Sequence, residues 1–104
     1  MKSNFHSLIQ SEIPTLIDFS AVWCTPCKMM AQVLEQVKST LGEQVRIIKI
    51  DVDKNPVIAS AMQIQGVPTL ILYRSGKSLW RQSGVIAATQ LIQIIQQHNA
   101  AIGK

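Results

Sequence analysis

The chain has 104 residues, a formal net charge of +4, 47% hydrophobic residues and only 15% charged residues. This length is enough for a single domain, over residues 1–104, with one hydrophobic core, and the hydrophobic fraction excludes a disordered chain. The modest charge, without a run of lysine or arginine and with few aromatic residues, argues against nucleic-acid binding.

The sequence carries no signal for the membrane or for export. No apolar run is long enough to span a membrane, and the first ten residues lack the apolar centre of a signal peptide. We therefore expect a cytoplasmic protein that does not enter the membrane. In such a reducing compartment two cysteines are more often reactive than structural.

The first half of the chain alternates strand and helix patterns. Apolar residues at helical spacing predict a short helix before Pro14. The apolar run 15–20 predicts a buried strand, although Asp18 interrupts it. Helical spacing then predicts a long helix over about 25–41, and the β-branched run 45–51 predicts a second strand.

The second half begins with a short helix at Asn55-Pro56, where the proline suits the first turn. After a loop at 65–68, the runs 69–73 and 78–82 predict two strands joined in a hairpin. Leu91, Ile92, Ile95 and Ile102 then form the apolar face of a last helix, with glutamines on its outer side. This order predicts a layered α/β domain whose first strands are parallel, with an antiparallel hairpin at one edge of the sheet.

The chain has two cysteines, Cys24 and Cys27, and they lie where the first strand leads into the long helix. A thiol at a helix N-terminus lies at the positive end of the helix dipole, which favours the nucleophilic thiolate. Two thiols at this spacing can form a disulfide with each other. One attacks a foreign disulfide, and the other resolves the mixed intermediate.

In this context the chain resembles the thioredoxin family. Several separate stretches carry the resemblance, in the right order: Asp18-Phe19, Ala21-Val22-Trp23-Cys24-Thr25-Pro26-Cys27-Lys28-Met29, Asp53-Lys54-Asn55-Pro56, Gly66-Val67-Pro68-Thr69 and Gly84. The resemblance implies a thioredoxin fold, with a central mixed β-sheet flanked by helices. The N-terminus is short for the family's usual first strand, so we expect about four strands instead of five.

Three positions depart from the family pattern. Thr25 occupies a position where thioredoxins usually have glycine, so Thr25 and Pro26 are expected to tune the redox potential. Gln32 replaces a proline that kinks the long helix, which predicts a straighter helix here. Ser20 replaces the family's first tryptophan.

The resemblance also implies roles for single residues. Cys24 would be the nucleophile, with an exposed side chain, and Cys27 the resolving thiol. Asp18 would be a buried base that takes the Cys27 proton through water, with a pKa raised by burial. Lys49 would pair with Asp18, and Pro68 would be a cis-proline packed against the disulfide. The alternatives are a surface-facing Asp18 and a simply solvated Lys49.

A flat, mostly apolar docking surface around the cysteines is implied as well. Its expected residues are Trp23, Gly66, Val67, Gly84 and Val85. The backbone next to Pro68 would pair with a substrate peptide like an added strand. For Trp23 the alternative is core packing.

These features predict a monomeric reductase of protein disulfides that acts through the Cys24/Cys27 couple. It would be recharged by an NADPH-dependent flavoprotein similar to thioredoxin reductase. We expect no bound cofactor and no metal, because His6, His98 and the acidic residues stand at no ligand spacing. Two alternatives stay open: a thiol oxidase or disulfide isomerase on the same fold, and a redox-gated binding module without turnover.

Overall fold

The computed structural model describes residues 2–102, and its elements follow the predicted order. The elements are α1 (Lys2–Leu8), β1 (Thr15–Ser20), α2 (Thr25–Leu41), the short 3-10 helix η1 (Gly42–Gln44), β2 (Arg46–Asp51), α3 (Pro56–Ala61), β3 (Thr69–Arg74), β4 (Lys77–Ser83) and α4 (Ala88–Ile102). The predicted bounds of β1 and α2 are confirmed, and those of the other strands are off by a residue.

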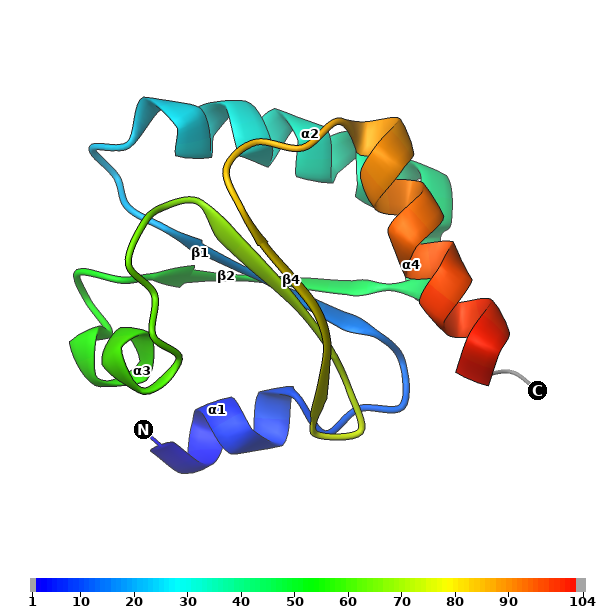
Figure 1. The fold of residues 1–104 in the computed structure, drawn as a ribbon, viewed down its shortest axis with the longest axis horizontal. Coiled ribbons are helices and arrows are strands. Elements are labelled where there is room, and N and C mark those ends of the chain that lie inside the picture. The colour runs from blue at the N-terminus through cyan, green and yellow to red at the C-terminus, as the bar shows by residue number, and fades with distance from the viewer. Residues whose placement is uncertain (1, 103–104) are drawn as a thin grey trace.

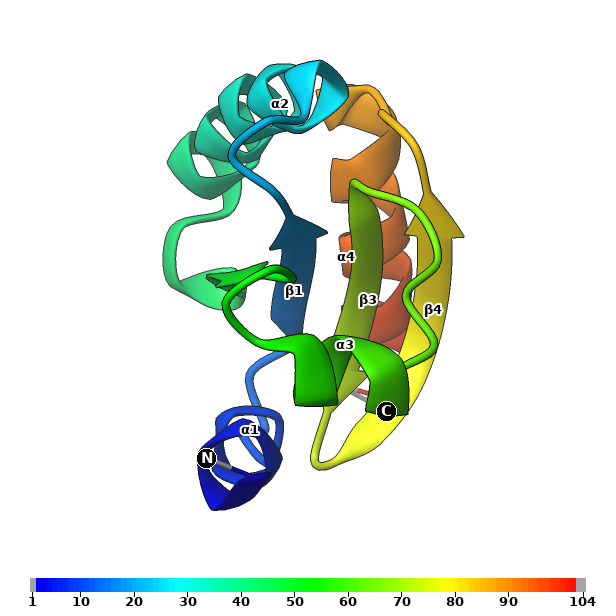
Figure 2. The same cartoon turned by 90° about the vertical axis from the view of Figure 1, so that its left-hand side faces the viewer.

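The four strands form one mixed sheet in the order β2-β1-β3-β4. As predicted, β1 and β2 are parallel, and β3 and β4 form an antiparallel hairpin. Helices α2 and α4 cover one face of the sheet, whereas α1 and α3 lie on the other (Figure 1; Figure 2). All six residues of β1 are buried because this inner strand is covered on both faces.

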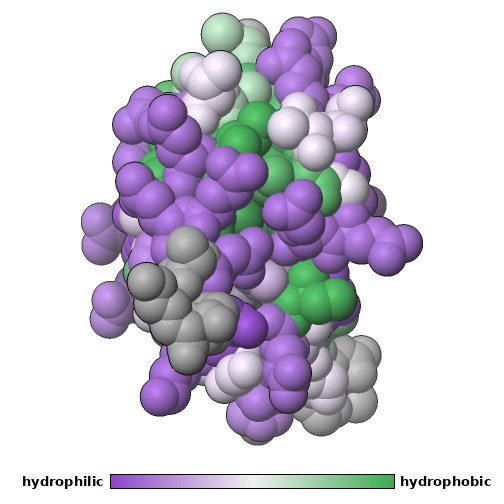
Figure 3. All heavy atoms as spheres, turned by 90° about the vertical axis from the view of Figure 1, so that its right-hand side faces the viewer, coloured by the Kyte–Doolittle hydropathy of each residue, from purple (hydrophilic) through white to green (hydrophobic). Residues whose placement is uncertain are grey.

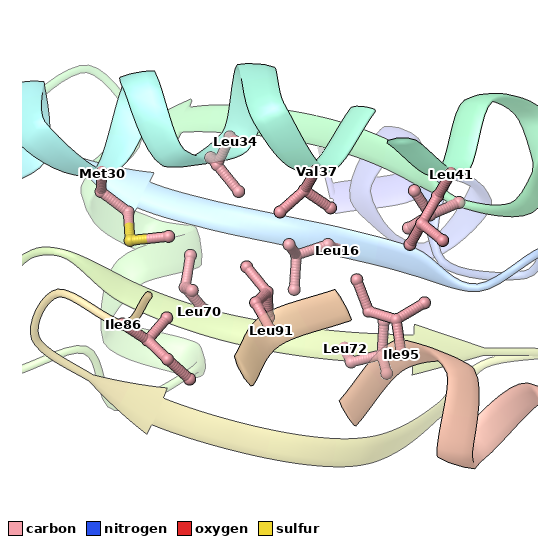
Figure 4. Close-up of a cluster of buried hydrophobic side chains, with 11 residues drawn as sticks. Leu16, Met30, Leu34, Val37, Leu41, Leu70, Leu72, Ile86, Leu91 and Ile95 are labelled. Carbon is pink, nitrogen blue, oxygen red and sulfur yellow. The ribbon is translucent and has the colours of Figure 1, made fainter. Parts of the chain in front are cut away.

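Alternate residues of the inner strands point into two separate cores, as the two-residue repeat of a strand requires. Leu16 of β1 packs with residues of α2 and α4 in the larger core (Figure 4). The members of that core are Leu16, Met30, Leu34, Val37, Leu41, Val45, Leu70, Leu72, Ile86, Leu91 and Ile95. Ile17, next in β1, belongs to the second core on the α1 side.

Aromatic packing attaches α1 to the sheet. The ring of Phe5 lies 5.9 Å from that of Tyr73, edge to face, and 6.4 Å from that of Phe19. Such pairs stabilise beyond the area that they bury. The short N-terminal helix therefore covers the sheet face that α2 and α4 leave open.

Helix α2 runs without a break past Gln32 (Figure 1), and Gly42 ends it with a positive φ of 56°. A straighter course than in relatives with proline stays a prediction.

On the side of the molecule where α4 lies, the surface is mostly hydrophilic (Figure 3). Its exposed residues include the expected glutamines, Gln90, Gln93, Gln96 and Gln97. The side chain of Ile102 lies outside the described side chains. None of the helices described over residues 2–102 is long and apolar enough to cross a membrane.

Candidate active site

The Cys24/Cys27 disulfide lies where the chain leaves β1 and enters α2. Cys24 is the N-cap of α2, and its Sγ accepts a hydrogen bond of 3.1 Å from the Cys27 backbone N–H. Pro26 lies in the first turn of α2. Proline suits this position because a backbone N–H there would have no acceptor within the helix. The helix N-terminus therefore directs a donor and its positive dipole end at the Cys24 sulfur, which favours a thiolate there once the disulfide is reduced.

Both cysteines are buried in this disulfide form. Cys24 is 3% exposed and Cys27 2% exposed, so the prediction of an exposed Cys24 side chain is wrong here. The reason is a tertiary contact: Ala21 and Val67 pack on the pair, and Cys24 Sγ lies 3.7 Å from the Val67 carbonyl oxygen. The Val67 backbone therefore lies directly beside the disulfide.

Asp18 lies fully buried in β1, so the alternative of a surface-facing acid is wrong. Among the described side chains, neither of its carboxylate oxygens has a hydrogen-bond partner. Burial raises the pKa of Asp18 from its ordinary 3.8 to about 6, although the charge of Lys49 opposes this shift. Lys49 is the cross-strand neighbour of Asp18 in β2, so the expected pair is electrostatic rather than hydrogen-bonded.

A cavity of about 270 Å³ adjoins Asp18 beneath α2. Besides Asp18, it is lined by Ala31, Leu34, Glu35, Lys38, Ile47 and Lys49. Its volume is several times the ~30 Å³ that a water occupies in the liquid, and polar groups line it. The cavity therefore places a space large enough for water next to Asp18, whose carboxylate oxygens are themselves buried.

The Pro68 loop faces the cysteines because β3 runs antiparallel to β1, which places Thr69 opposite Phe19. The Val67–Pro68 peptide bond is cis, as the resemblance implied, and Pro68 is buried. Thr69 Oγ1 donates to the Gly66 carbonyl at 2.6 Å, and the Gly84 N–H donates to the Pro68 carbonyl at 2.8 Å.

Gly84 has a φ of 91°, a left-handed conformation that L side chains rarely adopt. Its hydrogen bond to Pro68 brings the chain around Val85 to the cis-proline loop. Gly66, Val67 and Gly84 therefore lie close together around Pro68. Val85, the next residue after Gly84, has an apolar side chain that is 42% exposed.

Trp23 is 67% exposed, so core packing is excluded for it. Its indole Nε1–H donates a hydrogen bond of 2.8 Å to Asp53 Oδ2, which holds the ring in place next to Cys24. Two further apolar side chains, Val22 and Met29, are exposed beside the disulfide in the sequence. Asp53, Val22 and Met29 were not among the residues assigned a role from sequence, although all three lie in the stretches of family resemblance.

We expect Asp53→Ala to lower the rate of protein-disulfide reduction about two- to fivefold, because an exposed hydrogen bond contributes on the order of 1 kcal/mol. The indole would lose its anchor and would order only on substrate binding. Insulin reduction by the pre-reduced protein measures the effect. Asp53→Asn keeps an acceptor oxygen and should retain most of the rate. Equal losses in both variants would contradict an anchoring role.

The thioredoxin family model matches residues 1–97 of this chain. A thioredoxin-like protein of Synechocystis is 50% identical over 95 residues, with 90% of each chain covered. Chloroplastic thioredoxin Y of rice is 42% identical over 90% of this chain, which spans 56% of that longer protein. The structure of chloroplastic thioredoxin z superposes with a TM-score of 0.85, at 32% identity, over 95% of this chain and 89% of that one. Mitochondrial thioredoxin 3 of Saccharomyces cerevisiae gives a TM-score of 0.82, at 33% identity, over 92% and 89%.

The chain belongs to the thioredoxin family. Members of this family are protein-disulfide reductases that need no cofactor, so the chain is a protein thiol–disulfide oxidoreductase built on the Cys24/Cys27 disulfide. Within residues 2–102 no three His, Cys, Asp or Glu side chains gather in a way that could hold a metal ion.

Proposed function

We propose that the chain reduces disulfides of protein substrates with Cys24 as the nucleophile and Cys27 as the resolving thiol. The Cys24 thiolate attacks one sulfur of the substrate disulfide and expels the other as a thiolate. Cys27 then attacks Cys24 Sγ, which forms the Cys24/Cys27 disulfide and releases the second substrate sulfur. The observation that carries this order is the position of Cys24 as N-cap, with the Cys27 N–H directed at its sulfur.

Asp18 acts in the second step as the base for Cys27. The carboxylate accepts the Cys27 proton through water as the thiol attacks Cys24, and later loses it through the cavity beneath α2. Its complete burial, its unpartnered oxygens and its pKa of about 6 support this role, because a base near neutral pH is then available. Lys49 keeps the carboxylate partly ionised through its charge.

The substrate docks on the surface formed by Trp23, Gly66, Val67, Gly84 and Val85. Its backbone pairs with the chain next to Pro68, as an added strand would. The contact between Cys24 Sγ and the Val67 carbonyl supports this placement, because a segment bound along Val67 lies directly beside the nucleophile.

The electron donor we propose is an NADPH-dependent flavoprotein similar to thioredoxin reductase, and the working form is a monomer in the cytoplasm. Family membership supports the donor. Some relatives are named as chloroplastic, so localisation is tested directly by fractionating cells of the source organism. A purified thioredoxin reductase with NADPH should reduce the Cys24/Cys27 disulfide. A donor that leaves it oxidised while reducing an authentic thioredoxin would contradict the proposal.

Thr25 favours one alternative, a couple that works as an oxidase or isomerase. Threonine allows fewer backbone conformations between the cysteines than the family's usual glycine does. The Thr25 side chain is exposed at the start of α2. Equilibration with glutathione buffers decides between the directions. A potential near the ~−270 mV of thioredoxin supports a reductase, and one near the ~−120 mV of a strong oxidant supports the alternative.

We expect Thr25→Gly to make the potential more negative by up to about 30 mV, a tenfold change in the equilibrium constant. The same glutathione titration measures it. Thr40→Gly, in the last turn of α2, is the matched control and should leave the potential unchanged. If both replacements move the potential equally, the effect comes from weakening the helix and Thr25 has no tuning role.

A further inference from the structure

We propose that Arg81 of β4 is a positioning residue for the loop 64–68, which carries the Val67–Pro68 docking backbone. This inference rests on the proposed function, since it concerns how a protein substrate meets that backbone. Arg81 is far from the cysteines in sequence, and it acts on the loop through the end of helix α3.

Helix α3 ends in a motif that usually has glycine at its left-handed position, where this chain has Gln63. The Gln63 N–H donates to the Ser60 carbonyl at 3.0 Å, and the Ile64 N–H donates to the Ala59 carbonyl at 2.9 Å. This pair of bonds defines a Schellman cap, whose first residue past the helix adopts the left-handed conformation. Gln63 does so with a φ of 57°, which costs free energy for a residue with a Cβ. A further contact to this turn would offset that cost.

The guanidinium of Arg81 in β4 holds the turn at the end of α3. Its Nη1 donates to the Met62 carbonyl at 2.6 Å, and its Nη2 donates to the Gln63 carbonyl at 2.7 Å. The Met62 carbonyl is one of those that a helix end leaves without an intrahelical partner, and the Gln63 carbonyl follows it in the turn. A cation is favoured at that negative end. The fork fixes two successive peptide groups at once, which a single donor cannot do.

Tyr73 of β3 adds a second contact to the same turn. Its hydroxyl donates to Met62 Sδ at 3.1 Å, and its ring packs against Phe5 in the second core. Burial raises the pKa of Tyr73, although the charge of Arg81 opposes this, so the hydroxyl keeps its proton as a donor. The start of the loop is thus held from both strands of the hairpin.

The other end of the loop is also held by β4. Ser83 Oγ lies 2.9 Å from Thr69 Oγ1, and the Gly84 N–H binds the Pro68 carbonyl. Strand β4 and the residue after it therefore hold both ends of the loop, with Arg81 at the first and Ser83 and Gly84 at the second. Between these anchors lies Val67, whose carbonyl meets Cys24 Sγ. Loss of the first anchor displaces the backbone that a substrate peptide must pair with, and leaves the cysteines intact.

Arg81→Met tests this inference in single turnovers of the protein reduced beforehand with dithiothreitol. Small misplacements of positioning groups cost up to about a hundredfold, so we expect the rate with insulin to fall on the order of tenfold. The rate with cystamine, a small disulfide without a peptide backbone, should stay within about twofold, because it needs no strand pairing. Arg81→Lys should give an intermediate loss with insulin, since lysine offers no fork.

A second replacement separates positioning from general damage. Gly at position 63 adopts a positive φ without strain, so the double variant Arg81→Met/Gln63→Gly should recover most of the insulin rate. Arg74→Met, at the other end of the hairpin, should leave both rates unchanged. The proposal is overturned if Arg81→Met keeps its insulin rate, if both substrates slow equally, or if Gln63→Gly restores nothing. Failure of the proposed function is a different result, namely a parent protein that reduces neither substrate.

Discussion

Cys24→Ser should lower insulin-disulfide reduction by at least about a thousandfold, because it removes the only nucleophile that the proposed first step uses. Serine keeps the N-cap geometry and can still accept from the Cys27 N–H, so the helix start survives. The loss is therefore chemical rather than structural. The initial rate of insulin precipitation with dithiothreitol as reductant measures it, and circular dichroism checks the fold.

Cys27→Ser should behave differently and serves as the partner experiment. Cys24 would still attack, but nothing would resolve the mixed disulfide, so substrate proteins should accumulate covalently on Cys24. Electrophoresis without reductant should show many adducts that disappear on reduction. A single partner retained even by the Cys24→Ser variant would instead identify a redox-gated binding module. A Cys24→Ser protein as active as the parent would contradict the proposed mechanism.

Asp18→Asn should change both stability and activity as functions of pH. The folded protein holds the Asp18 proton at a pH where the unfolded chain has lost it, since the pKa is raised from 3.8 to about 6. Stability from this group is thus fully present below pH 3.8 and falls as the pH rises to about 6. The loss amounts to about 3 kcal/mol at higher pH.

Asparagine cannot ionise, so this fall between about pH 4 and pH 6 should disappear from urea-unfolding curves of the variant. At pH 7.5 the variant should be more stable than the parent by about 1 to 3 kcal/mol, with the unpartnered amide offsetting part of the gain. Glu43→Gln, an exposed replacement in η1, is the control and should leave the pH dependence unchanged. A variant with the same pH dependence as the parent would show that Asp18 ionises as freely in the folded state as in the unfolded one.

The resolving step should slow in the same Asp18→Asn variant. Loss of a general base typically costs at least about a hundredfold, and a residue acting through water stands at the low end of that range. The pH profile of mixed-disulfide resolution should lose its inflection near pH 6. Lys49→Met should keep the inflection but move it higher, because the Lys49 charge lowers the Asp18 pKa. Stopped-flow decay of the mixed disulfide follows both.

Sequence reasoning succeeded where the cause was local. The apolar spacing of α2 and the glycine after it marked both ends of that helix, because helical periodicity repeats every few residues. Asp18 was singled out since an acid within an apolar strand is costly wherever that strand is buried. The parallel first strands and the antiparallel hairpin at one edge followed from general rules of chain connection.

The errors and omissions lie in contacts between residues distant in the chain. Cys24 was expected to be exposed, but Val67, forty-three positions away, covers it. The hydrogen bond from Trp23 to Asp53 spans thirty positions. Nothing in the sequence distinguishes Arg81 from other charged strand residues. Its two acceptors are backbone carbonyls, which every residue has, so residue type cannot reveal them.

The sequence by itself therefore determined the chemistry: two thiols at a helix start, an acid in the strand before them, and a Gly-Val-Pro loop to face them. Periodicity and residue type suffice for the thiols and the acid, since they act within one element. The place of the loop opposite them was implied by the resemblance to the thioredoxin family. Only the tertiary structure decided how accessible the sulfur is, which cavity adjoins Asp18, and which residues contact the Trp23 ring and the loop 64–68. These depend on where backbone carbonyls and distant side chains meet in space, and no local pattern encodes that meeting.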